Sequence, residues 1–237
     1  MTMRTYFTGA LAAGVIVCAA GAAQAGIYNT AASLTGSRSL GAGLAGAIPG
    51  ATGTASATLD WTITDQGTYF HYSYTLTTNS QQGVSHFIID VSDVAECATA
   101  YGAGNACFAD VSISLGGTPG LIQFGDYDAA NGNPGLPGTI VDGWKVNITS
   151  GAPIFTIEFN SDRAPVWGDF YAKAGNGTSN GYALYNQGCC FNLVSTNVLD
   201  FVARPDSVKI TVPEPASLAL VGLGLAGIGV ARRRRAA

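Results

Sequence analysis

Side chains able to do acid, base or nucleophilic chemistry are few in this chain of 237 residues. The two histidines, His71 and His86, each lie in a stretch with the pattern of a β-strand, beside aromatic residues. A catalytic histidine needs a nucleophile and an orienting carboxylate within hydrogen-bond reach, and no motif supplies them. Glu96 and Glu158 stand in no recognisable arrangement of paired catalytic carboxylates. The sequence therefore predicts a protein without enzymatic activity.

The stretch GDYDAANGNPG at residues 125–135 gathers oxygen-bearing side chains in one loop. Its candidate calcium ligands are Asp126, Asp128, Asn131 and Asn133, because oxygen-rich loops bind this ion. The spacing differs from an EF-hand loop, which needs glycine where Asn131 stands and a glutamate at its last position. The alternative is a solvated loop, since Asn, Asp, Gly and Pro also form tight turns.

A second candidate site surrounds Trp167, whose aromatic face could stack on a sugar ring. Its candidate polar partners are Asp162, Asp169 and Tyr171. The alternative is that these four residues only pack in the core and its loops.

Five cysteines occur, and Cys18 lies in the apolar N-terminal segment. The other four are Cys97, Cys107, Cys189 and Cys190, an even number that suits an oxidising compartment. A Cys97–Cys107 disulfide would close a small polar loop and stabilise it by about 2–3 kcal/mol. It would leave a vicinal Cys189–Cys190 pair, while the alternative joins one or both of these to the 97–107 loop. Zinc is disfavoured because no CxxC motif occurs.

The first 25 residues have the pattern of a secretory signal peptide. One basic residue, Arg4, precedes an apolar stretch that ends in small residues at Ala23 and Ala25. A signal peptidase accepts small side chains at these positions, so we expect cleavage before Gly26.

The last residues combine an extended segment, an apolar run and a basic cluster. Pro213, Glu214 and Pro215 precede residues 216–231, which carry no charge and would form a helix of about 24 Å, against about 30 Å for a hydrocarbon core. The basic cluster that follows consists of Arg232, Arg233, Arg234 and Arg235. Arginines hold a terminus on the cytoplasmic side, so we expect a transient single pass through the inner membrane.

This order of tripeptide, apolar helix and arginines resembles the PEP-CTERM sorting signal of Gram-negative bacteria. The resemblance covers about the last 25 residues of the chain. It implies processing by the membrane enzyme exosortase near residues 213–215, delivery to the cell surface or extracellular space, and association with exopolysaccharide and biofilm. The same tail is sometimes labelled the C-terminal region of ice-binding proteins, which describes the tail and not the rest of the chain. A permanent membrane anchor is the alternative.

Between the two ends the pattern is that of an all-β domain. Short runs with alternating apolar and polar residues are separated by turns rich in Gly, Asn and Pro, and no long amphipathic helix appears. We predict one β-sandwich, jelly-roll or Ig-like, over residues 57–211, after a thinly packed Gly/Ala/Ser/Thr-rich lead-in at 26–56 that contains at most one edge strand. The sorting signal takes residues 212–237. Expected strands begin near residues 57, 68, 85, 110, 121, 143, 154, 169 and 207.

Charge narrows the partners that such a domain can bind. Residues 26–212 hold six basic and fourteen acidic side chains, a net charge of −8, which disfavours nucleic acid. We expect an exported surface or matrix protein with a structural or adhesive role, contacting exopolysaccharide. The alternatives are a secreted carbohydrate-active enzyme or a protein that binds a small ligand, carbohydrate or ice. Ice binding is disfavoured because Thr75, Thr77 and Thr78 are too few for a regular face.

Overall fold

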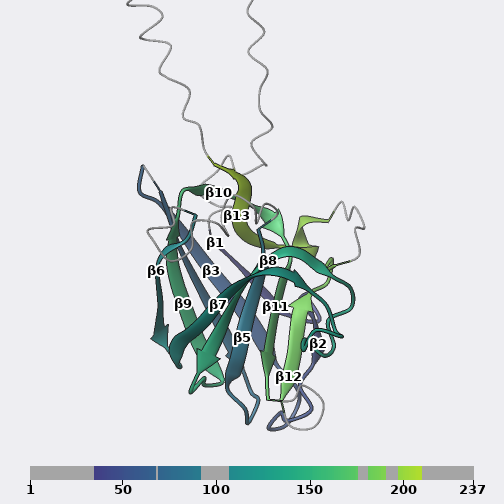
Figure 1. Ribbon diagram of the computed structural model, residues 1–237. Helices are drawn as coiled ribbons and strands as arrows, with labels where there is room; N and C mark the ends of the chain where they lie inside the picture. The colour runs from purple at the N-terminus through teal and green to yellow at the C-terminus, as the bar shows by residue number, and fades with distance from the viewer. Residues whose placement is uncertain (1–34, 68, 92–106, 176–180, 191–196, 210–237) are drawn as a thin grey trace, which may run out of the picture.

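The computed structural model describes residues 35–67, 69–91, 107–175, 181–190 and 197–209 (Figure 1). This part of the chain is all-β, as expected, and its one helix is the short 3₁₀ turn η2 (Val198–Asp200). The expected signal peptide, the tail and Cys97 lie outside the described residues. The strands are β1 (Thr35–Leu40), β2 (Gly43–Ala47), β3 (Ala57–Asp65), β4 (Phe70–Thr78), β5 (Val84–Asp90), β6 (Ala109–Leu115), β7 (Thr118–Tyr127), β8 (Ile140–Thr149), β9 (Ile154–Ser161), β10 (Arg163–Gly168), β11 (Phe170–Ala174), β12 (Tyr182–Asn186) and β13 (Val202–Lys209).

The strands form one continuous sheet in the order β6-β9-β4-β3-β1-β2-β12-β11-β5-β8-β7, with β10 and β13 as a separate two-stranded sheet. The expected sandwich of two separate sheets is therefore replaced by a single sheet that curls around its core. Its edge strands β6 and β7 follow each other in sequence and are joined through Gly116 and Gly117, which brings the two edges together at that end. We call β6, β9, β4, β3 and β1 the β4 layer, and β2, β12, β11, β5, β8 and β7 the β5 layer.

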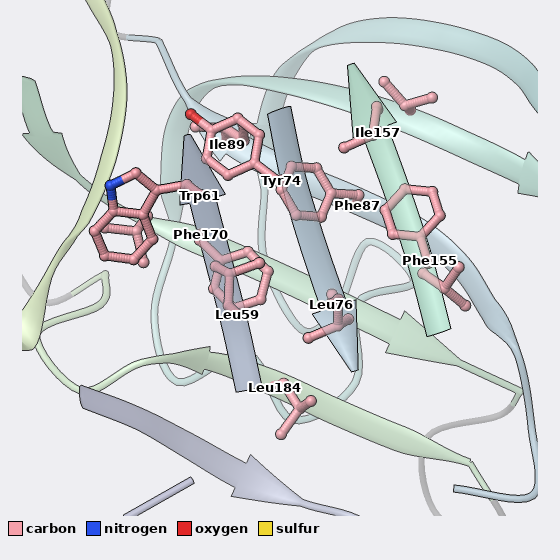
Figure 2. Packing of buried hydrophobic residues seen from close by; sticks show 14 of the residues in the cluster. Leu59, Trp61, Tyr74, Leu76, Phe87, Ile89, Phe155, Ile157, Phe170 and Leu184 are labelled. Carbon is pink, nitrogen blue, oxygen red and sulfur yellow. The ribbon is translucent and has the colours of Figure 1, made fainter. Parts of the chain in front are cut away.

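The core between the two layers is rich in aromatic residues (Figure 2). Alternate residues of β4 point inward, so Tyr72, Tyr74 and Leu76 are almost fully buried. Tyr74 of the β4 layer lies 5.6 Å, between ring centroids, from Phe87 of the β5 layer. Trp144 of β8 meets Phe159 of β9 edge to face at 4.8 Å. Such contacts add about 0.5–1.5 kcal/mol each beyond the burial of area, and they hold the layers together.

The Gly/Ala/Ser/Thr-rich stretch is a central part of this sheet rather than a thin lead-in. Two of its segments, β1 and β2, pair in parallel with each other and connect β3 to β12. Their small residues are required by close packing, because a Cβ on Gly36 would overlap the ring of Trp61. Gly46, at φ +125°, likewise lies against the backbone carbonyl of Ala183. These two strands could not be predicted from composition, because glycine and alanine are depleted in most strands.

Three further strands differ from the sequence expectation. β10 and β12 were not expected as separate strands, and β13 begins at Val202, five residues before the expected start near residue 207. β12 is only five residues long, and three of them, Tyr182, Ala183 and Leu184, are consecutive and buried on both faces of the sheet. A short run without alternation carries no period-two signal, which explains why β12 was missed.

Candidate functional site

The outer side of the β4 layer is an exposed face built mainly from hydroxyl side chains. Inward residues of β3 and β4 alternate with outward ones, and the antiparallel register aligns the outward ones in rows across the strands. We call this surface the hydroxyl face. It comprises Thr35, Ser37, Ser39, Thr58, Asp60, Thr62, Thr64, His71, Ser73, Thr75, Thr77, Asp110, Ser112, Ser114, Leu115, Ile154, Thr156, Glu158 and Asn160.

Hydroxyl groups occupy most of these positions, and no lysine or arginine is among them. The charged residues are three acids, Asp60, Asp110 and Glu158. Neighbouring strands are about 4.8 Å apart, and outward residues along one strand repeat every 6.6 Å or so. The face therefore presents rows of hydrogen-bond donors and acceptors on a broad sheet.

Hydrogen bonds across the strands fix the side chains of this face. Thr75 and Thr156 share a bond of 3.0 Å between their Oγ1 atoms, and the hydroxyl of Ser73 donates to Glu158 Oε1 over 3.4 Å. Side chains already held by cross-strand bonds lose less conformational entropy when a ligand binds.

Three hydrogen-bonded polar side chains lie at one end of the hydroxyl face. Nδ1 of His71 lies 2.9 Å from Oδ1 of Asn160, and Nδ2 of Asn160 donates to Oδ2 of Asp110 at 2.8 Å. This arrangement places His71 beside an amide, and the carboxylate of Asp110 binds the amide and not the imidazole. It is a fixed polar surface, consistent with the expectation that His71 is a strand residue.

The calcium candidates do not point toward a common centre. Oδ1 of Asp126 accepts from the backbone N–H of Asp142 at 3.0 Å, and Oδ1 of Asp128 accepts from that of Asn131 at 2.8 Å. Asn133 is fully buried, and its Oδ1 accepts from the ammonium of Lys145 at 3.2 Å. The ammonium of Lys145 thus occupies the Asn133 oxygen that a calcium ion would need, and the carboxylates of Asp126 and Asp128 accept hydrogen bonds from backbone N–H groups.

The residues of the candidate sugar site likewise have different contacts and do not face one ligand. Trp167 of β10 packs edge to face on Trp61 at 6.3 Å, and the guanidinium of Arg38 lies over its ring at 5.4 Å. Asp162 pairs with Arg163 at 3.2 Å. Tyr171 is fully buried and donates its hydroxyl to the carbonyl of Pro134 at 2.8 Å.

Asp169, the fourth candidate of that site, lies beside Cys190 and Asn186 instead. Its carboxylate accepts from Asn186 Nδ2 at 2.9 Å and from the backbone N–H of Cys190 at 3.0 Å. Burial raises the pKa of this carboxyl above its usual value, and the bond from Asn186 opposes that shift. Trp167, Asp162, Tyr171 and Asp169 therefore do not form one sugar-stacking surface.

The cysteines of the described residues are all in disulfides. Cys189 is joined to Cys190, and Cys107 is disulfide-bonded to a partner outside the described residues. Within the described ranges, one group of acidic, cysteine or histidine side chains lies close enough to hold a metal ion, and it is Asp169 with this cysteine pair. Sulfurs that are bonded to each other are not thiolates, so the group does not act as a metal site in this form.

Arg38 lines a hollow of about 350 Å³ beside the end of β1. Its Nε and Nη2 donate to the carbonyls of Phe201 and Val198, each at 3.0 Å, and its guanidinium stacks over Trp61 at 4.9 Å. These bonds join β1 to the segment around η2. No local sequence pattern points to a role for Arg38, since its partners lie about 160 residues away.

The fold and the hydroxyl face define an acidic all-β protein with a broad polar face. The chain carries a PEP-CTERM protein-sorting motif at residues 211–235, as the sequence predicted. This motif implies processing by exosortase during export, with a transient membrane-anchored stage. No curated protein and no solved structure matches the chain. Among the described residues, no helix has the length and apolar character needed to cross a membrane.

Proposed function

We propose that this protein is a non-enzymatic adhesive component of the cell surface or extracellular matrix, and that it contacts exopolysaccharide through the hydroxyl face. The observation that carries the proposal is the combination of a sorting motif at residues 211–235 with an exposed hydroxyl-rich sheet face. Sorting directs the protein to the outside of the cell. The face offers hydrogen bonds there to a polymer whose own surface is rich in hydroxyl groups.

The composition of the face favours a polysaccharide over ice. The face presents many more hydroxyl groups than those of Thr75 and Thr77, although Thr78 points inward and is 7% exposed. However, Asp60 stands opposite Thr75 and Glu158 stands opposite Ser73 in the register. Carboxylates interrupt a uniform hydroxyl lattice, whereas they are good acceptors for sugar hydroxyls.

The same geometry disfavours the polysaccharide-acting enzyme. Hydrolysis of a glycosidic bond uses two carboxyl groups that flank the bond. Glu158 lies on a broad exposed face, where it accepts a hydrogen bond from Ser73. This environment suits binding along a chain and not cleavage of one bond.

Co-sedimentation of the processed protein with the host's exopolysaccharide tests the proposal. Thr62→Val combined with Thr75→Val removes two hydroxyls from adjacent strands with little change in shape. We expect binding to weaken by about 10-fold or more, because each lost hydrogen bond is worth about 1 kcal/mol.

Thr118→Val on β7 is the matched control, since this exposed threonine lies outside the hydroxyl face. It should bind like the unchanged protein. If the double variant binds as well as the control, or if the unchanged protein does not bind, the proposed role of the hydroxyl face is wrong.

A further inference from the structure

The outer side of the β5 layer differs from the hydroxyl face, because residues 128–139 cover it. Beneath this loop lie His86 of β5, Lys145 of β8 and Lys173 of β11, all on the same side of the sheet. In the register, Lys173 stands opposite His86, while Lys145 stands opposite Ile88, two residues further along β5. His86 is 5% exposed and Lys145 is 9% exposed. No carboxylate in the described ranges forms an ion pair with Lys145. Burial of an unpaired ammonium is costly, so the contacts of Lys145 need an explanation.

The ammonium of Lys145 meets a carboxamide. Its Nζ lies 3.2 Å from Oδ1 of Asn133, whose side chain is fully buried. The amide nitrogen of Asn133 donates to the backbone carbonyls of Asp128 and Asn131 at 3.0 and 3.1 Å. The loop thus holds the carboxamide from one side while the lysine approaches it from the sheet.

Aromatic and aliphatic side chains exclude water from this pair. The ring of Tyr127 lies 5.2 Å from Nζ of Lys145, and the ring of Tyr171 stacks on His86 at 5.7 Å. Both tyrosines belong to a second buried cluster with Ile88, Leu136 and Ile140, separate from the main core. Exclusion of water protects a reactive pair from hydrolysis and strengthens local electrostatic effects.

The surroundings of Lys145 ease the loss of a proton from its amine. Burial, and secondarily the charge of Lys173, lowers the pKa of Lys145 from its usual value. Burial, and secondarily Lys145 and Lys173, also lower the pKa of His86 to about 3, while the polar side chain of Asn133 opposes this shift. His86 is therefore a neutral base, and its Nε2 has no hydrogen-bond partner within the described ranges.

We propose that Lys145 and Asn133 join in an intramolecular isopeptide bond, with His86 as the group that transfers the proton. The neutral amine of Lys145 attacks Cγ of Asn133, and the imidazole of His86 accepts the proton that the amine loses. His86 then returns this proton to the amide nitrogen of Asn133, the Cγ–Nδ2 bond breaks, and ammonia leaves. One C–N bond replaces another, so no oxidant or cofactor is needed.

Lys173 provides an internal comparison. Its side chain is half-buried, and its Nζ lies 3.4 Å from the backbone carbonyl of Gly132. A backbone amide has no free ammonia to release, so this lysine should stay unmodified. The reaction is thereby assigned to the lysine whose partner is a side-chain carboxamide.

Peptide mapping of the processed protein, reduced and alkylated, tests the proposal. Cleavage before aspartate separates residues 128–141, which contain Asn133, from residues 142–161, which contain Lys145. We expect these two peptides to appear as one joined species, lighter than their sum by one ammonia. Trypsin should also fail to cut after Lys145. A mass loss of one ammonia does not by itself prove the bond, because the Asn131–Gly132 sequence can also lose ammonia by cyclising on the backbone.

Three variants assign the roles. Lys145→Arg keeps a long basic side chain but lacks the primary amine, so the two peptides should separate completely, whereas Lys173→Arg should leave them joined. His86→Gln should reduce the joined fraction by 10-fold or more in freshly made protein, since proton transfer contributes about that much or more. Two separate peptides from the unchanged protein, with ordinary cleavage after Lys145, would overturn the proposal whatever the variants show. Joined peptides in the Lys145→Arg variant would overturn it equally. This result does not depend on polysaccharide binding.

Discussion

Arg163 is a charged side chain at the centre of several buried contacts, and it is 2% exposed. Its Nε pairs with Asp162 at 3.2 Å, its Nη2 lies 3.1 Å from Sγ of Cys107, and its carbonyl accepts from the hydroxyl of Tyr72 at 2.8 Å. One residue thus joins β4, the bend between β9 and β10, and the segment before β6.

Arg163→Ala should lower the free energy of unfolding by about 3 kcal/mol, because it removes the ion pair with Asp162 and opens a cavity. Arg163→Lys should recover part of this loss, since the charge remains while the planar set of donors does not. Urea unfolding of the three proteins measures the difference. Equal stability of the alanine variant and the unchanged protein would show that these contacts contribute nothing net.

His86 should make stability depend on pH. Its pKa is about 3 in the folded protein against 6.5 as the ordinary value. Between these values the unfolded chain binds the proton and the folded protein does not. The free energy of unfolding should therefore fall as pH falls through this window, by up to about 1.4 kcal/mol per pH unit, and stay level above it.

His86→Gln removes the titrating imidazole, so the free energy of unfolding of this variant should depend less on pH. Urea unfolding at several pH values between about 4 and 7 compares the slopes of the two proteins. Parallel slopes would show that His86 does not titrate in the way its burial implies.

At the scale of elements, the close crossing of the connection before β5 and the connection after β8 depends on two glycines. A Cβ on Gly83 would overlap the backbone carbonyl of Gly151, and the N–H of Val84 donates to the carbonyl of Ala152 at 3.2 Å. Gly83→Ala should destabilise the protein by about 1–3 kcal/mol through overpacking.

Gly120→Ala is the matched control for this change. Its Cβ would first meet the carbonyl of Asn147 at 3.1 Å, a contact that a small shift relieves. Thermal unfolding of both variants should give the larger loss for Gly83→Ala. A larger loss for Gly120→Ala would contradict the packing argument.

The elements that the sequence predicted well are those whose outward and inward residues alternate. The β3–β4 hairpin was expected with its turn at residues 65–67, and the structure has both strands there. Alternation is a local property, so a single sequence reveals it. The hydroxyl face is different, because His71, Thr156 and Asp110 come together only through strand pairing. The approach of Lys145 to Asn133 likewise depends on a loop conformation that composition does not encode.

At the scale of the whole molecule, the sorting motif predicts how the chain is processed. Replacing Pro213, Glu214 and Pro215 by alanines should keep the protein in the inner membrane with its arginines attached. The unchanged protein should end near these residues. Intact mass of protein from membrane and culture medium distinguishes the two forms, and a mass that runs through Ala237 in the medium would exclude cleavage.

The two chain ends of the domain meet in its structure, and this fixes when the domain can close. β2 pairs with β12, and Arg38 binds the carbonyl of Phe201. The N-terminal strands therefore need partners from the C-terminal part of the domain. Long-range pairing of this kind is slow to form. A chain exported from its N-terminus cannot complete the sheet until residues 182–186 have crossed the membrane. Closure of the domain therefore cannot begin until little more than the sorting motif at residues 211–235 remains to be exported, so folding is completed late in export.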